Sequence, residues 1–230
     1  MYTINVISRR KELQRQNIDN VKAILDGIHS EKEIRAALNS KALDRVMLEF
    51  DMTLPQLLGA CQANHLFAGM VALHCAVVSS RQGAILESEI IKGISTVLSE
   101  NNISMRKAKN VNEMRPMKSG GTMNAVQYSK VRNVRKKDAL KSIDAFITEP
   151  FEAYVFAKVR TGVGGHQDNV DIEAHEFISW AKNEPNDKLY ICLIDGEKDD
   201  TLYNSQTDNV WVCNHVEFQE RVISYAEQCD

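Results

Sequence analysis

Two charged residues interrupt segments whose composition is otherwise typical of buried strands. Asp144 lies within the apolar, β-branched segment 142–148, and Lys158 lies within the similar segment 153–160. Burying either charge is costly unless the charge is paired or holds a metal. The segment 149–152 between them (EPFE) suits a hairpin turn. A hairpin would bring the two side chains together at the surface of a sheet.

The helix expected next in the chain, 169–182, offers a third charged group. Stepping ~100° per residue places Glu173 at the border of the apolar stripe, one turn before Phe177. Glu176 lies further round, towards solvent. We therefore expect Glu173 to reach over the strands, with Glu176 and Glu152 as the alternative acids.

These residue types fit metal-assisted hydrolysis of a phosphodiester. Magnesium prefers hard oxygen ligands, so Asp144 and Glu173 would bind Mg²⁺. Lys158 would be catalytic, because it can position or deprotonate the attacking water or stabilise charge in the transition state. The same three residues also fit a structural ion-pair network, which perturbs charges without catalysis.

A basic segment at 106–141 favours a phosphate backbone as partner. It holds eleven Lys and Arg residues against two acids, although the whole chain has a net charge of −3. Local positive charge of this kind attracts nucleic acid, whereas a solvated basic loop is the simpler interpretation. The residues of this segment expected to contact double-stranded DNA are Arg115, Lys118, Lys130, Arg132, Arg135 and Lys136.

The sequence RTGVGGHQDN at 160–169 is the most distinctive string in the chain. It lacks the Gly-Lys-Ser/Thr ending of a phosphate-binding P-loop and the GxGxxG spacing of a dinucleotide fold. Its polar residues precede a helix, where phosphate is favoured, and amide side chains can also read adenine edges. We expect Arg160, His166, Gln167 and Asn169 to contact DNA, in roles that the sequence leaves open.

The expected elements give an α/β fold with a helical N-terminal half. Apolar residues at three- and four-residue steps predict helices at 11–29, 31–43, 54–78 and 88–98. After the hairpin and the helix at 169–182, strands are expected at 188–195 and 209–213 and a closing helix at 216–228. A strand–helix–strand crossover makes two strands parallel, so the sheet should be mixed and flanked by helices. We expect a helical region 1–105 and an α/β core 106–230, together forming one compact domain.

The remaining composition points to a cytoplasmic protein. The five cysteines are an odd number without CxxC spacing, which is typical of reduced thiols. The first residues lack the apolar core of a signal peptide. The most apolar stretch, 57–78, is interrupted by polar residues, so we expect a buried helix and no membrane span.

The segments around Asp144, Phe156–Lys158 and the loop 161–169 resemble the PD-(D/E)xK type II restriction endonucleases. The resemblance covers about 142–196 and is closest to the variant that carries its second acid on the downstream helix. Length and motif are most similar to the SinI and AvaII type, which implies a restriction-endonuclease-like core and a homodimer that cuts the palindrome GGWCC (W is A or T) with magnesium. Two departures stand out: no proline precedes Asp144, and Phe156 occupies the usual glutamate position.

Two other functions remain open at this point. A non-catalytic DNA-binding or regulatory protein would keep the basic segment and use the Asp–Lys–Glu set structurally. A small-molecule enzyme would use the glycine loop at 161–165 to bind a nucleotide. Fold-level resemblance alone does not decide among these functions.

Overall fold

The computed structural model describes residues 1–27, 29–38, 40–76, 79–110, 113–160, 167–196 and 200–229. The chain divides into two compact units: a helical unit, Ser8–Ala84, and a sheet unit formed by Met1–Ile7 with Ile85–Asp230. The division therefore falls well before the 105/106 boundary that the sequence led us to expect, because strand β1 at 104–107 already pairs within the sheet. Within the described residues, no helix is long and apolar enough to cross a membrane.

One of the helices expected in the helical unit is divided in two by a cap residue. Asn64 is extended (φ −143°), and its side chain accepts hydrogen bonds from the amides of Leu66 and Phe67. An N-cap of this kind ends one helix and starts the next. The single helix expected at 54–78 therefore forms two separate helices. The helices are α1 (Val6–Asp26), α2 (Glu31–Ala37), α3 (Ser40–Glu49), α4 (Leu54–Ala63) and α5 (His65–Cys75).

The sheet unit contains a five-stranded mixed sheet, which confirms the α/β expectation. The strand order is β1-β4-β5-β6-β7; β1, β4 and β5 are antiparallel neighbours, whereas β5, β6 and β7 are parallel. The first of these strands was not expected from the sequence. The elements are α6 (Ser79–Glu100), β1 (Ser104–Lys107), β4 (Ala145–Glu149), β5 (Ala153–Arg160), α8 (Gln167–Ala181), β6 (Leu189–Gly196), α9 (Asp200–Tyr203), β7 (Val210–Cys213) and α10 (His215–Ala226).

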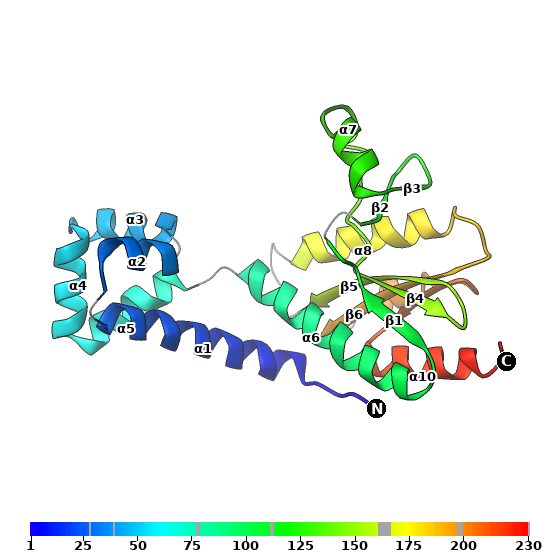
Figure 1. The fold of residues 1–230 in the computed structure, drawn as a ribbon, viewed down its shortest axis with the longest axis horizontal. Coiled ribbons are helices and arrows are strands. Elements are labelled where there is room, and N and C mark those ends of the chain that lie inside the picture. Colours follow the sequence, from blue (N-terminus) through cyan, green and yellow to red (C-terminus); the bar gives the residue numbers. More distant parts are fainter. Residues whose placement is uncertain are drawn as a thin grey trace. The chain divides into compact units, whose positions relative to one another are not determined.

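Helices cover both faces of this sheet (Figure 1). Side chains alternate along each strand, so even-numbered residues such as Phe156 and Cys192 join the core beneath α8. Odd-numbered residues such as Val155 and Ile191 are fully buried on the opposite face, towards α6 and α10. All five cysteines are free, and all but Cys229 are buried.

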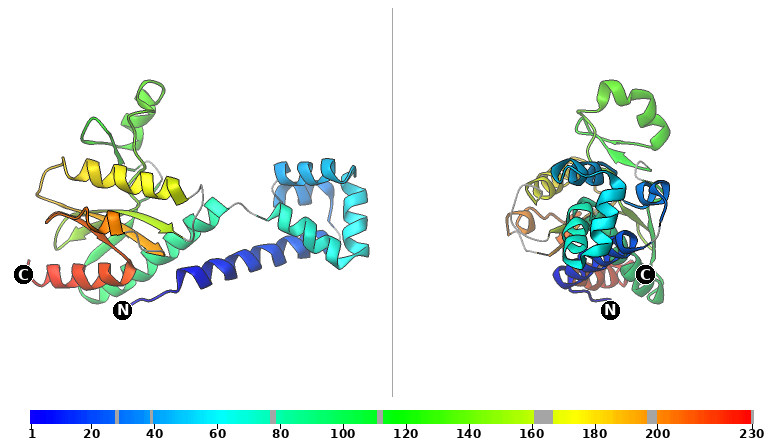
Figure 2. Two further views of the ribbon diagram at one scale, coloured as in Figure 1. Left: turned by 180° about the vertical axis from the view of Figure 1, so that it is seen from behind. Right: turned by 90° about the vertical axis from the view of Figure 1, so that its left-hand side faces the viewer.

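A small subdomain stands clear of the sheet in both figures (Figures 1 and 2). It consists of β2 (Arg115–Pro116), β3 (Thr122–Met123) and α7 (Ala125–Arg135). Its glycines and proline are typical of a loop, yet residues 115–116 and 122–123 pair as two short antiparallel strands. Within the basic segment, Ala125–Arg135 is helical, and Asn124 and Gln127 form a reciprocal capping box at the start of this helix.

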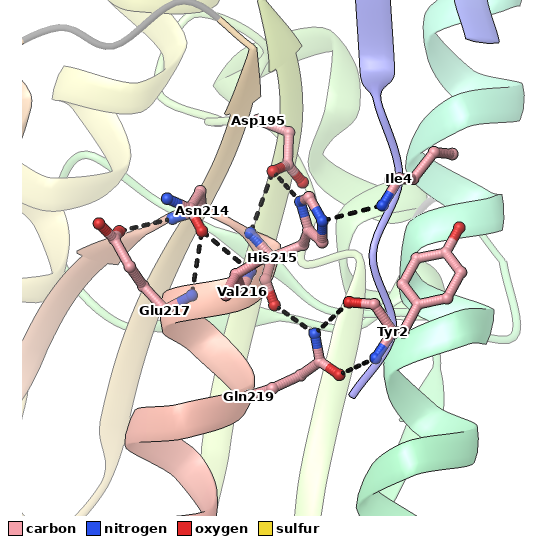
Figure 3. A network of polar contacts seen from close by, with 8 residues as sticks. All are labelled: Tyr2, Ile4, Asp195, Asn214, His215, Val216, Glu217 and Gln219. Atoms are coloured by element: carbon pink, nitrogen blue, oxygen red, sulfur yellow. Dashed lines mark hydrogen bonds and ion pairs between the residues drawn. The ribbon is translucent and has the colours of Figure 1, made fainter.

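The first residues of the chain are bound to α10, as Figure 3 shows. The amide of Tyr2 donates to Gln219 Oε1 (2.7 Å), and the amide of Ile4 donates to His215 Nε2 (3.2 Å). His215 Nδ1 lies 2.5 Å from Asp195 Oδ1. Because Nε2 accepts, Nδ1 carries the proton and donates it to Asp195. Both ring nitrogens are used structurally, so this buried pair fixes the N-terminal segment.

The glycine at the end of β6 permits a close approach between two strands. Gly196 has a φ of +108°, and a Cβ there would lie 1.6 Å from the carbonyl oxygen of Arg160. We expect Gly196→Ala to lower the free energy of unfolding by at least about 2 kcal/mol, through backbone strain and a clash that only main-chain movement can relieve. Urea titration followed by circular dichroism measures the change.

Gly59, in α4, provides the matched control, because no atom lies within 4 Å of the position of its missing Cβ. Gly59→Ala should be neutral or stabilise the protein by up to about 1 kcal/mol. Equal stability of the two variants would contradict the strand contact described for Gly196.

Candidate active site

The β4–β5 hairpin positions Asp144 and Lys158 on one face of the sheet. Ala145 pairs with Val155, so Asp144 lies opposite Phe156 and diagonal to Lys158, all on the side covered by α8. Asp144 directly precedes β4 and extends its ladder, since its amide donates to the Val155 carbonyl (2.9 Å). Its Oδ2 accepts a hydrogen bond from the amide of Ala157 (2.9 Å), which fixes the carboxylate beside the lysine strand.

An aromatic stack aligns α8 with β5. The rings of Phe156 and Phe177 stack at 5.1 Å with 15° between their planes, and Lys158 Nζ lies 4.9 Å from the Phe156 ring centre. Glu173 is one turn before Phe177, so the stack places its carboxylate over the strand. Glu173 Oε2 lies 3.7 Å from Lys158 Nζ. Phe156 thus helps to place an acid from α8 beside Lys158.

The two alternative acids lie elsewhere. Glu152 pairs with Lys188 (2.6 Å) at the opposite end of β5, and Glu176 pairs with Lys118. Lys141 Nζ lies 3.2 Å from the other oxygen of Glu173. Of the three candidates, Glu173 is therefore the one beside Lys158.

Glu87, in α6, is a further member of the site that the sequence analysis missed. Its Oε1 lies 3.8 Å from Lys158 Nζ, and its side chain is only 19% exposed. The sequence carried a signal for it: Glu87 precedes the buried residues Ile91 and Ile94 by four and seven positions, which places an acid on the buried stripe of the helix. The helix expected at 88–98 began one residue too late to include it.

Burial and mutual proximity shift the pKa values of the clustered groups. Burial lowers the pKa of Lys158, but Glu87, Asp144 and Glu173 raise it more, so the net pKa is raised and the ammonium keeps its proton. Burial raises the pKa of Asp144, against the opposing effects of Lys158 and the Ala157 amide. Burial is also the largest effect on Glu87 and, with repulsion from Asp144 and Glu173, raises its pKa to about 7. Three acids thus share one cation in a poorly hydrated place, and burial favours the protonated form of Glu87 and Asp144.

The donor chemistry of this cluster fits Mg²⁺. Asp144 and Glu173 offer carboxylate oxygens next to Lys158, and magnesium is commonly held by one or two carboxylates together with waters and substrate oxygens. The described residues contain no group of three or more His, Cys, Asp or Glu side chains arranged around one metal position. The described protein atoms alone therefore do not complete a coordination shell, to which substrate and water would contribute further ligands.

Four of the expected DNA contacts are engaged within the protein. Arg115 donates to the Leu140 carbonyl, and Arg135 pairs with Asp138 (2.8 Å). Lys118 pairs with Glu176, as described above. Arg160 Nη2 lies 3.1 Å from Asp171 Oδ2, with both side chains largely buried. These cations stabilise the fold around the site before they meet any ligand.

The other expected contacts are exposed or fall outside the description. Lys130, Arg132 and Lys136 are exposed on or just after α7, and Asn169 is exposed in the first turn of α8. His166 lies outside the described residues, as does the side chain of Gln167. The free cationic surface of the described residues in this segment is thus concentrated around α7.

Comparison of the chain with protein-family models, with curated proteins and with solved structures finds no match.

The raised pKa of Glu87 makes stability depend on pH. The folded protein holds this proton up to about pH 7, whereas an unfolded glutamate loses it near its ordinary value of about 4.3. Between these values the folded state binds more protons, so the free energy of unfolding falls as pH rises. Going from about pH 5 to pH 8 with chelator present, wild type should lose about 1–3 kcal/mol more than Glu87→Gln.

Urea titrations at the two pH values measure this difference. Glu100→Gln, at the exposed end of the same helix, should follow the wild-type pH dependence. If Glu87→Gln does so as well, the carboxylate is not held in the desolvated position described.

Proposed function

We propose that this protein is a type II restriction endonuclease that hydrolyses phosphodiester bonds of double-stranded DNA with Mg²⁺. The observation that carries the proposal is the position of Lys158. Its ammonium lies 3.7 Å from Glu173 and 3.8 Å from Glu87, beside Asp144, at the end of a strand in a mixed sheet. This arrangement supports PD-(D/E)xK chemistry in its variant form, for which a restriction-endonuclease-like core would be the scaffold.

Each group has a chemical role in this proposal. Asp144 and Glu173 would hold the metal, and the Ala157 amide orients Asp144 for that purpose. Bound Mg²⁺ would lower the pKa of the attacking water and neutralise charge on the phosphate. Lys158 keeps its proton, so it offers positive charge to the developing transition state and does not remove a proton from water. Glu87, whose carboxyl oxygen lies 3.8 Å from the ammonium, would help to position Lys158.

The substrate class follows from the distribution of charge. The exposed cations around α7 suit the phosphate backbone of a duplex, whose affinity for proteins is dominated by such contacts. A homodimer would cut both strands of a palindrome, because a two-fold protein matches a two-fold site. The resemblance to the SinI and AvaII type makes GGWCC the first site to test.

Substitution of the clustered residues separates catalysis from binding. Asp144→Asn, Lys158→Met and Glu173→Gln should each lower the rate of plasmid cleavage in Mg²⁺ by at least about 100-fold, because each removes a metal ligand or transition-state charge. Binding of duplex DNA, measured by gel shift without metal, should persist. Cleavage by the wild type should stop when chelator is added.

Glu152→Gln is the control, since it neutralises an exposed acid at the far end of the same strand. It should cut at the wild-type rate and give the same fragment pattern on phage DNA. Binding without cleavage by the wild type in any divalent metal would reject the nuclease and leave the non-catalytic DNA-binding alternative. Full activity of Asp144→Asn would reject the site.

A further inference from the structure

The two sides of α7 have different tasks. Tyr128 is buried on the inner side, beneath the guanidinium of Arg115, whose Cζ lies 4.7 Å from the ring centre. Val126, Lys130 and Asn133 are exposed on the outer side. Val126 and Lys130 each stand two residues from Tyr128, about 200° around the helix. Their spacing of four and then three residues aligns the exposed side chains in one stripe along the helix.

The inner side is held by the subdomain itself. Arg115 Nη1 donates to the Leu140 carbonyl (2.5 Å), and the Leu140 amide donates to the Pro116 carbonyl (3.0 Å). Asp138 accepts hydrogen bonds from the Ser119 amide and from Arg135 (2.8 Å each). These contacts tie both ends of the segment together at its base. The helix is therefore presented on a fixed support, away from the sheet (Figures 1 and 2).

The charge around α7 has one sign. Residues 125–137 contain five Lys and Arg residues and no acid. Arg135 is engaged by Asp138, whereas the other cations are exposed and have no described protein partner. These exposed cations are Lys130, Arg132, Lys136 and Lys137. They surround a helix of 11 residues with a positive field that suits a polyanion.

The stripe itself fits base edges better than other polyanionic surfaces. Lysine can bind guanine O6 and N7, asparagine can bind adenine N6 and N7, and an apolar side chain can contact the thymine methyl group. A membrane-surface helix would need a broad apolar face, whereas Val126 is the single exposed large apolar residue among the α7 side chains that the structure describes. Duplex RNA has a major groove too narrow for a helix.

We infer that α7 enters the major groove of duplex DNA and reads its sequence through Val126, Lys130 and Asn133. Arg132 and Lys136 contact the flanking phosphates and set affinity without sequence information. The inference rests on the proposed function for the identity of the partner, but it concerns binding and needs no catalysis.

Selection of bound duplexes from a random pool, in chelator, tests the inference. Asn133→Ala and Lys130→Ala should each reduce discrimination at one or two positions of the selected site by about 10- to 100-fold. Arg132→Gln and Lys136→Gln should weaken binding equally on all sequences and reduce the slope of log affinity against log salt by about one unit each. Lys182→Gln, an exposed lysine in another region, should change neither quantity.

The outcomes separate the two proposals. Unchanged base preference in the Asn133 and Lys130 variants, with duplex binding and Mg²⁺-dependent cleavage intact, would overturn the role of α7 and leave the nuclease standing. Loss of discrimination in those variants of a protein that never cleaves would support α7 and reject the nuclease. Absence of duplex binding by the wild type would overturn both. All substituted side chains are exposed, so thermal melting should match the wild type.

Discussion

The ammonium group of Lys158 is held near the end of β5 with only 15% of its side chain exposed, and this constrains its surroundings. A desolvated cation needs negative partners, and three carboxylates from three separate elements supply them. Removing that cation would leave three acids close together in a poorly hydrated place. The cluster is thus stable only while the hairpin, α6 and α8 all keep their positions, so the packing of the sheet unit and the electrostatics of the site depend on each other.

The sequence predicted the parts of this site that follow from strand alternation. Asp144 and Lys158 stood out because each was a charge in an apolar strand, and the bounds of β5 were predicted at both ends. Glu173 was found because helical periodicity relates it to Phe177. Glu87 was missed because the helix expected at 88–98 excluded it, although helical periodicity places it on the buried stripe. Its contact with Lys158, 71 positions later in the chain, is encoded by no local pattern. The position of α7 was missed because its capping residues lie in a segment whose glycines and proline are typical of loops.

Acidic and basic residues of the sheet unit are concentrated in two different places. Acids from the β4–β5 hairpin, α6 and α8 gather around Lys158, while exposed cations gather on the subdomain of α7. In the described part of the basic segment, several cations that looked equivalent in sequence differ in role: Arg115 and Arg135 hold the subdomain together, whereas Lys130 and Arg132 are open to solvent. Charge counted along a sequence therefore overstates the surface that a ligand meets.

The helical unit, Ser8–Ala84, is one uninterrupted stretch, whereas the sheet unit needs residues 1–7 as well as 85–230. During synthesis on a ribosome, the helical unit can fold soon after it emerges. The segment that holds Tyr2 and Ile4 must wait for Gln219 and His215, which are 217 and 211 residues later. Closure of the sheet unit by its first residues is therefore a late event in biogenesis, and nascent chains without α10 leave that segment unbound.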